Sequence, residues 1–309
     1  MSVLLLESLH PEAEALLAAA GEVTRAADPN VPGPSVPYAR LQAIITRGRG
    51  RIDAALMARC PALLAVARSG VGLDNVDLTA ARARGIPVLF APGGNTATTA
   101  EHTIALLLAF TRRVPQTARA VAEGRWEERG NYAGDEACGK TLGIVGYGAI
   151  GQRVARIAAA LGMEVLVAER TGLSCEHPML PLPKLLRRAD FVSLHLPLTP
   201  ATRGLIGAAE FALMKPGACL INTARGSLVD QIALTAALAS GRLGGFAADV
   251  LDPEPPAANE PLLRSERVLI TPHVASLTAS TYRDLCLTTV RNVLAVLRGE
   301  AVDPRFVRQ

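Results

Sequence analysis

Three side chains that can bind or protonate a small acid each follow a short apolar segment in the second half of the chain. Arg225 follows CLINTA, Glu254 follows GGFAADVLDP, and His273 follows RVLITP. Ligands of open parallel sheets bind beyond the carboxyl ends of the strands, so these three residues can converge in one crevice. Each also has a structural alternative: a helix cap or surface ion pair for Arg225, a solvated loop acid for Glu254, and a strand-end position for His273. The surrounding elements have to decide between the two interpretations.

The second half of the chain has the alternating pattern of an α/β domain. Short runs rich in Val, Ile and Leu alternate with helical patterns, which predicts βαβ units and a parallel sheet. Six strands are predicted, at 141–146, 164–169, 191–196, 218–223, 244–250 and 267–271.

The first half shows the same alternation on a smaller scale. Strands are predicted at 3–6, 43–46, 63–67 and 87–90, and helices at 11–20, 53–59 and 76–84. A long helix over 95–113, with Pro115 as its stop, joins two domains. The polar, weakly periodic segment 117–139 resembles an arm or a connection, and an arm can lie on another subunit. The amphipathic segment 277–300 returns to the first domain, because a terminal helix needs a face to cover.

These patterns predict two domains. The first is made from residues 1–93 and 281–309, and the second from residues 94–280 is inserted into it. At 309 residues, the chain is long enough for each domain to bury its own core.

A glycine-rich turn follows the first strand predicted for the second half of the chain. The segment TLGIVGYGAIGQRVARIAAALG places Gly146, Gly148 and Gly151 between a strand and an amphipathic helix. In that context the glycines allow a tight turn and the close approach of a pyrophosphate to the helix N-terminus. Glu169, eighteen residues after Gly151, is placed to accept hydrogen bonds from the adenosine ribose. A carboxylate there favours NAD, whereas the adjacent Arg170 leaves NADP open.

The composition excludes several other classes of protein. The net charge is +4, and the densest basic segment, TRGRGRID at 46–53, has no interleaved aromatic residues, which argues against a nucleic-acid partner. The longest apolar run, Ile104 to Phe110, is far shorter than the roughly 20 residues of a membrane span. Five dispersed cysteines without a CxxC motif indicate neither a disulfide framework nor a zinc site, so we expect no metal and a cytoplasmic location.

Several motifs in order resemble one family. These are SGVGLDNVD at 69–77, APGGNTATTAEHT at 91–103, and then VGYGAIG, INTARGSLVD, DVLDPEPP and TPHVAS. Together they are similar to the D-isomer-specific 2-hydroxyacid dehydrogenases, which include phosphoglycerate dehydrogenase and the hydroxypyruvate and glyoxylate reductases. The resemblance implies two Rossmann-like parallel-sheet domains, with the cofactor domain inserted into a flavodoxin-like substrate domain. It also implies a homodimer built on the cofactor domains.

The resemblance implies a role for each matching residue. Arg225 binds the substrate, and Glu254 partners His273, which donates a proton to the carbonyl oxygen of a 2-keto acid and takes it back in the reverse reaction. Besides Arg225, the residues implied to bind substrate are Val71 and Gly72, to which we add Arg47. The cofactor-binding set comprises Gly146, Gly148, Ala149, Ile150, Gly151, Glu169, Arg170, His195, Pro197, Thr202, Thr223, Ala224 and Asp249. His195 is expected to be structural, as is His102 in AEHT.

The substrate tail is not determined by these motifs. Glyoxylate, hydroxypyruvate and 3-phosphohydroxypyruvate share the same 2-keto acid head. Arg47, Arg49 and Arg68 either bind a phosphate or form a solvated basic face. The predicted function is therefore that of an NAD-dependent D-2-hydroxyacid dehydrogenase whose particular substrate the sequence does not determine. The alternative is a cofactor-sensing binding protein of the corepressor type.

Overall fold

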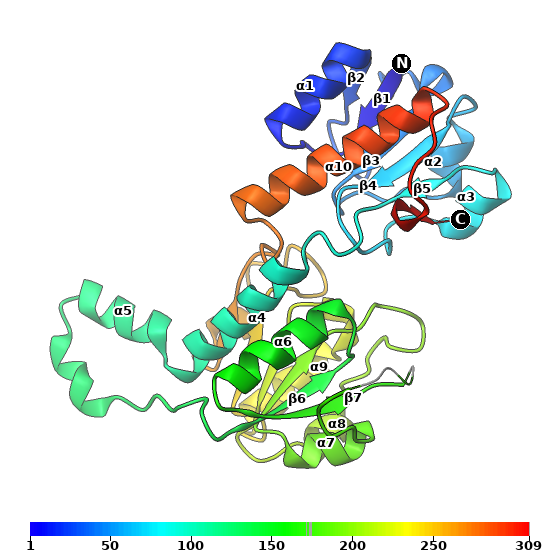
Figure 1. Ribbon diagram of the computed structural model, residues 1–309. Coiled ribbons are helices and arrows are strands. Elements are labelled where there is room, and N and C mark those ends of the chain that lie inside the picture. The colour runs from blue at the N-terminus through cyan, green and yellow to red at the C-terminus, as the bar shows by residue number, and fades with distance from the viewer. Residues whose placement is uncertain (171, 173–174, 309) are drawn as a thin grey trace. The chain divides into compact units, whose positions relative to one another are not determined.

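The computed structural model describes residues 1–170, 172 and 175–308, and the chain divides into two compact units. Unit 1 comprises Met1–Asn95 and Ser276–Gln309, and unit 2 comprises Thr96–Ala275. The chain therefore leaves unit 1 once and returns to it, as the blue and red segments of Figure 1 show.

Unit 1 is built on a six-stranded sheet in the order β12-β5-β4-β3-β1-β2. Its strands are β1 (Ser2–Leu5), β2 (Glu22–Arg25), β3 (Ala43–Thr46), β4 (Ala65–Arg68), β5 (Val88–Leu89) and β12 (Val307–Arg308). The four predicted strands are confirmed, and the order from β2 to β5 is the flavodoxin-like one. The edge strands β2 and β12 were not predicted, because neither contains an apolar run. β12 is antiparallel to β5, so the sheet is not wholly parallel.

Helices cover both faces of this sheet. On one face, α1 (Pro11–Ala20) and α10 (Ala279–Leu297) pack over Val3, Leu5 and Ile45. On the other face lie α2 (Ala54–Ala58) and α3 (Leu78–Ala83). The predicted return of the last helix to the first domain is confirmed. The apolar face of α10 packs on the sheet, which removes it from water.

Unit 2 contains a wholly parallel sheet in the order β11-β10-β9-β8-β6-β7. Its strands are β6 (Thr141–Val145), β7 (Glu164–Ala168), β8 (Phe191–Leu194), β9 (Cys219–Asn222), β10 (Gly245–Ala248) and β11 (Val268–Ile270). All six predicted strands are confirmed. The order reverses between β6 and β8, which is the kind of switch point where such sheets bind ligands.

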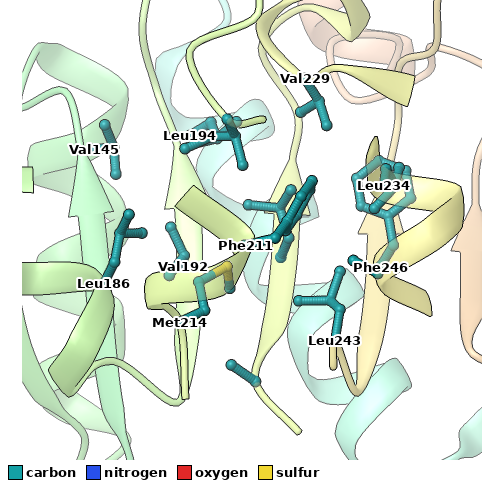
Figure 2. Packing of buried hydrophobic residues seen from close by; sticks show 14 of the residues in the cluster. Val145, Leu186, Val192, Leu194, Phe211, Met214, Val229, Leu234, Leu243 and Phe246 are labelled. Atoms are coloured by element: carbon teal, nitrogen blue, oxygen red, sulfur yellow. The ribbon is translucent and has the colours of Figure 1, made fainter. Parts of the chain in front are cut away.

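Two layers of helices bury this sheet. On one face, α4 (Thr96–Thr111) and α6 (Ala149–Ala160) pack over Ile144, Val167 and Ile221. On the other lie α7 (Leu182–Arg188), α8 (Ala208–Leu213) and α9 (Gln231–Ala239), whose core with the sheet includes Val192, Phe211 and Phe246 (Figure 2). Strands buried on both faces explain why β6, β8, β9 and β10 are continuous apolar runs instead of alternating ones.

The connection after α4 differs from its prediction in two ways. The long helix ends at Thr111, and the chain turns at Arg113, whose φ of 49° is left-handed. Pro115 does not follow the stop as a loop residue but lies in the first turn of a second helix, α5 (Val114–Ala122), where its missing N–H is not needed. The segment 117–139, predicted to be an arm or connection, thus begins inside α5 and contains a short 3₁₀ helix at Trp126–Asn131.

In the residues that the structure describes, four further 3₁₀ helices connect the main elements, at Tyr38–Arg40, Gly226–Leu228, Pro261–Arg264 and Pro304–Phe306. Within the part of the chain that the structure describes, no helix combines the length and the apolar character needed to cross a membrane.

Candidate active site

The three residues singled out at the start all lie beyond the carboxyl edge of the unit 2 sheet. Arg225 follows β9, Glu254 follows β10 and His273 follows β11, and these are three adjacent strands. Their position after parallel strands is the one that the sequence predicted. Two of the three also meet directly.

His273 and Glu254 form a close pair. The Nδ1 atom of His273 lies 2.6 Å from Oε2 of Glu254, and 42% and 37% of the two side chains are exposed. The other carboxylate oxygen, Oε1, accepts the N–H of Leu251 at 3.0 Å, which orients the acid toward the ring. Because Nδ1 is engaged, Nε2 is the ring atom left to exchange a proton with a ligand.

The backbone at His273 is itself unusual. Its φ is 55°, one of two left-handed values among the described non-glycine residues. Such a conformation costs about 1–3 kcal/mol and persists only where its surroundings hold it. The N–H of His273 donates to the carbonyl oxygen of Asp249 at 2.9 Å, so the β10 end fixes the turn that presents the ring.

Arg225 is held by its own loop. Its Nη1 donates to the carbonyl oxygen of Ala224 at 2.7 Å. Asn222, the last residue of β9 and fully buried, donates from Nδ2 to the Arg225 carbonyl oxygen at 2.8 Å and accepts the N–H of Ala224 at 3.0 Å. The side chain at the strand end therefore shapes the turn that carries the arginine.

The glycine-rich turn is packed so closely that a side chain would clash at two of its three glycines. Gly146 has a φ of 94°, and a Cβ there would lie 2.5 Å from the carbonyl oxygen of His195. A Cβ on Gly151 would lie 2.2 Å from the carbonyl oxygen of Gly146, so only glycine lets α6 pack this closely on the strand. At Gly148 nothing lies within 4 Å of that position, and no side chain caps α6 there. Its first amides therefore remain open to an anion, and Ala149 and Ile150 begin the helix.

Glu169 closes the other side of this turn. Its Oε2 accepts the N–H of Tyr147 at 2.8 Å and its Oε1 accepts that of Arg170 at 2.7 Å. Tyr147 is buried, and desolvation together with a hydrogen bond to Cys175 raises the pKa of its hydroxyl to about 12. Glu169 thus ties β7 to the glycine turn, while the side chain of Arg170 is exposed.

The loop after β8 carries three further predicted cofactor residues. His195 has its Nε2 atom 2.9 Å from Oγ of Ser193, and desolvation lowers its pKa to about 4, so the ring is neutral at neutral pH. Thr202 donates its hydroxyl to the carbonyl oxygen of Pro197 at 2.8 Å, which closes this loop on itself. These contacts favour an orienting role for the loop over proton transfer.

Asp249 and His102 form a second histidine–carboxylate cluster, which the motifs did not bring together. Only 1% of the Asp249 side chain is exposed, and His102 Nε2 lies 3.5 Å from its Oδ1. His102 Nε2 is also 2.9 Å from Oγ1 of Thr271. A signal for this cluster in the sequence is Asp249 itself, a charged residue that directly follows the apolar strand β10. Among the described residues, no three His, Cys, Asp or Glu side chains are placed to hold a metal ion.

The predicted substrate residues Arg47, Val71 and Gly72 belong to unit 1 and follow β3 and β4. Arg47 Nη2 lies 3.6 Å from Oε1 of Glu7, and its guanidinium lies over the Tyr282 ring, 5.2 Å from the centroid. Glu7 Oε2 also accepts the N–H groups of the loop after β3, so this carboxylate organises the arginine loop.

Comparison with known proteins identifies a family for the inserted unit. Residues 104–275 match the family model described as "D-isomer specific 2-hydroxyacid dehydrogenase, NAD binding domain". A solved structure of D-lactate dehydrogenase from Aquifex aeolicus with NAD and lactic acid has a TM-score of 0.86 and 27% identity, covering 97% of this chain and 96% of that one.

Curated relatives have similar names. A glyoxylate reductase from Korarchaeum cryptofilum is 41% identical over 84% of this chain and 80% of its own length. A D-3-phosphoglycerate dehydrogenase from Archaeoglobus fulgidus is 38% identical over 84% of this chain, but the match covers only 50% of that protein. The chain spans about half the length of the D-3-phosphoglycerate dehydrogenases from Archaeoglobus fulgidus and Mycobacterium bovis.

Proposed function

This chain belongs to the D-isomer-specific 2-hydroxyacid dehydrogenase family, and on that premise we propose that it interconverts a small 2-keto acid and its D-2-hydroxy acid with a nicotinamide cofactor. The observation that carries the proposal is the 2.6 Å pair of His273 and Glu254, which follows strands of the same parallel sheet as the glycine turn. A histidine paired this way has one nitrogen held and one free for chemistry.

His273 acts as the acid and the base in this proposal. In the reducing direction the imidazolium donates its Nε2 proton to the carbonyl oxygen, and in the reverse direction neutral Nε2 accepts the hydroxyl proton. Glu254 stabilises the imidazolium by accepting the Nδ1–H and keeps the ring in one orientation. Exposure of both side chains lets the pair regain its proton from solvent.

Arg225 binds the acid. Its planar guanidinium offers paired N–H donors to a carboxylate or to the carbonyl oxygen, which a lysine does poorly. Because Nη1 is already anchored on Ala224, less freedom remains to be lost when the substrate arrives.

The glycine turn holds the cofactor in this proposal. Gly146, Gly148 and Gly151 admit the pyrophosphate, and Glu169 receives the ribose hydroxyls. The residues that complete the set are Ala149, Ile150, Arg170, His195, Pro197, Thr202, Thr223, Ala224 and Asp249. When bound, the reduced nicotinamide supplies a hydride to the carbonyl carbon. NAD is favoured because Glu169 repels a 2′-phosphate, and NADP is the alternative outcome of the test below.

Further substrate contacts are proposed for residues of unit 1. Val71 and Gly72 are proposed to present backbone N–H groups to the substrate carboxylate, as a glycine-containing turn can. Arg47 and Arg49 are proposed to bind a phosphate where the substrate carries one. Alanine at both positions should then weaken binding of 3-phosphohydroxypyruvate and leave that of glyoxylate unchanged. An unchanged KM for 3-phosphohydroxypyruvate in this variant would contradict the proposed phosphate contact.

A homodimer through unit 2 is also proposed. The segment 114–132 exposes four large apolar side chains, with exposed fractions of 51% for Val114, 54% for Val121, 66% for Trp126 and 44% for Tyr132. Their burial against a second copy removes that apolar surface from water. Light scattering after size exclusion should give a dimer for the wild type and a monomer for the Val121→Glu, Trp126→Glu variant.

A cytoplasmic location completes the proposal. All five cysteines are free, and Cys60, Cys219 and Cys286 are buried, as thiols of a reducing compartment are. Cell fractionation tests it, and recovery in a membrane or secreted fraction would contradict it.

Cofactor oxidation by the purified protein tests the whole assignment. NADH and NADPH are offered separately with glyoxylate, hydroxypyruvate, 3-phosphohydroxypyruvate and pyruvate, and loss of the reduced-nicotinamide absorbance is followed. Strong turnover of one acid with one cofactor is expected. No turnover of any acid, despite measurable NADH binding, would overturn the assignment.

A further inference from the structure

Two neighbouring residues of α4 each reach a loop that carries a proposed catalytic residue. His102 Nε2 lies 2.9 Å from Oγ1 of Thr271, which is two residues before His273. Thr103 Oγ1 lies 2.8 Å from Oγ1 of Thr223, which is two residues before Arg225. One turn of one helix therefore contacts both loops.

The His102 contact continues into Asp249. Oγ1 of Thr271 lies 2.5 Å from Oδ1 of Asp249, and a carboxylate can only accept, so the threonine hydroxyl donates. The threonine oxygen is then free to accept a proton from His102 Nε2. The result is a chain of donors that begins on α4 and ends on a buried carboxylate.

Asp249 in turn holds the segment around His273. Its Oδ1 accepts the N–H of Val274 at 2.9 Å, and its Oδ2 accepts that of Ala275 at 2.8 Å. Its carbonyl oxygen accepts the N–H of His273. Three consecutive amides thus point at one residue, which explains how a left-handed histidine is kept in place.

Asp249 keeps its charge in this setting. Burial raises the pKa of its carboxyl, but hydrogen bonds from His102, Thr271, Ala275 and Val274 outweigh that effect and leave the pKa below its ordinary value. The carboxylate is therefore an acceptor on both oxygens at neutral pH. It depends on His102 and Thr271, because a buried charge without donors is costly.

We propose that His102 is a positioning residue for His273, acting through Thr271 and Asp249. Its Nε2–H polarises the Thr271 hydroxyl toward Asp249, and Asp249 fixes the amides of residues 273–275. The ring of His273 is thereby held in the left-handed turn that aims it at the substrate. This inference rests on the proposed function of His273, whereas the hydrogen-bond chain itself does not.

Replacement of His102 by leucine tests the proposal, because leucine fills similar space without a donor. Amide exchange of Val274 and Ala275, followed by NMR or mass spectrometry, should become at least about tenfold faster. In turnover of the best acid, kcat should fall by about 10- to 100-fold, with the KM for the cofactor unchanged within about twofold. His102→Gln, which returns an N–H donor at a similar reach, should recover most of both losses.

A control on the same helix separates this effect from general damage to α4. The hydroxyl of Thr111, at the other end of α4, donates to the carbonyl oxygen of Leu107 at 2.7 Å, one turn back in the same helix. Thr111→Val should change neither the exchange of residues 274–275 nor kcat. If His102→Leu does not fold, Thr271→Val breaks the same chain with a smaller change in shape and should give the same two losses.

The outcomes separate the inference from the proposed function. Unchanged exchange and unchanged kcat in His102→Leu, with activity lost in His273→Ala, would overturn the inference alone. A glutamine variant as impaired as the leucine variant would also overturn it, because shape and not donation would then matter. Full activity of His273→Ala would overturn the proposed function, whatever the exchange rates show.

Discussion

Unit 2 contains two pairs of a histidine and a carboxylate, and the two pairs lie in different surroundings. His273 and Glu254 are both more than one-third exposed and lie 2.6 Å apart. His102 and Asp249 are 3.5 Å apart, and the carboxylate of the second pair is only 1% exposed. The exposed acid has one backbone donor besides its histidine, whereas the buried acid has a hydroxyl and two amides.

The difference fits the two proposed roles, proton transfer for His273 and positioning for His102. An exposed ring with a free nitrogen can give up a proton and recover it from solvent or a ligand. A buried carboxylate that already accepts several donors has no capacity for a substrate, but it fixes the loop to which those donors belong. Chemical identity alone therefore does not distinguish the two pairs; their solvent access and partners do.

Removal of the exposed histidine should have the largest effect on activity. We expect His273→Ala to lower kcat by roughly 10²–10⁴-fold, the usual contribution of general acid–base catalysis. His10→Ala, at the start of α1 in unit 1, is a matched histidine control and should keep its kcat. Steady-state kinetics with the best acid checks both, and full activity of His273→Ala would remove the distinction between the pairs.

Neutralisation of the buried acid should have the largest effect on stability. Asp249→Asn cannot accept both the Val274 and Ala275 amides and the Thr271 hydroxyl, so we expect the free energy of unfolding to fall by about 1–3 kcal/mol. Glu254→Gln, at the exposed pair, should change it by less than about 0.5 kcal/mol. Urea denaturation at pH 7 measures both, and equal losses would mean that burial does not distinguish the pairs.

The stability difference between the wild type and Asp249→Asn should also depend on pH. The pKa of Asp249 is lowered in the folded chain, so the unfolded chain binds the proton more readily. The contribution of the Asp249 carboxylate to the free energy of unfolding is fully present above the ordinary pKa of an aspartate. It is lost as the pH falls through the lower pKa of the folded chain. The stability difference between wild type and Asp249→Asn should therefore shrink in acid, and a difference that stays constant down to pH 3 would contradict the charged network.

Neutralisation of the exposed acid should mainly move a pH profile. In Glu254→Gln the imidazolium of His273 loses its charge partner and releases its proton sooner. We expect the alkaline limb of keto-acid reduction to shift to lower pH. A profile of kcat/KM against pH that superimposes on the wild type would show that the two residues are not coupled.

His195 allows a test of what burial alone does to a histidine. Desolvation lowers the pKa of His195 to about 4, whereas an unfolded histidine titrates near 6.5. The unfolded chain therefore binds the proton first, and stability should decline as the pH falls from about 6.5 to about 4. His195→Gln should lose this part of the decline in urea denaturation between pH 7 and pH 4, and an identical slope would place the ring in water.

The elements around both pairs were largely predictable, because their signals are local. Buried parallel strands are continuous apolar runs, and all six in unit 2 were found that way. The glycine turn followed from the spacing of Gly146, Gly148 and Gly151 after a strand. The missed β2 and β12 are short edge strands whose residues EVTR and VR carry no apolar run, since an edge needs only one covered side.

By itself, the sequence determined the fold class, the family and the placement of Arg225, Glu254 and His273 after strands, because strand, turn and helix preferences act over a few residues. Only the tertiary structure decided which side chains meet. His102 and Thr271 are 169 positions apart in the chain, and Thr103 and Thr223 are 120 apart. Contacts at such separations depend on how α4 packs on the sheet, and the residue pattern around either partner carries no trace of them. In the structure, His273 therefore keeps one ring nitrogen free, whereas His102 belongs to a hydrogen-bond network that ends on a buried carboxylate.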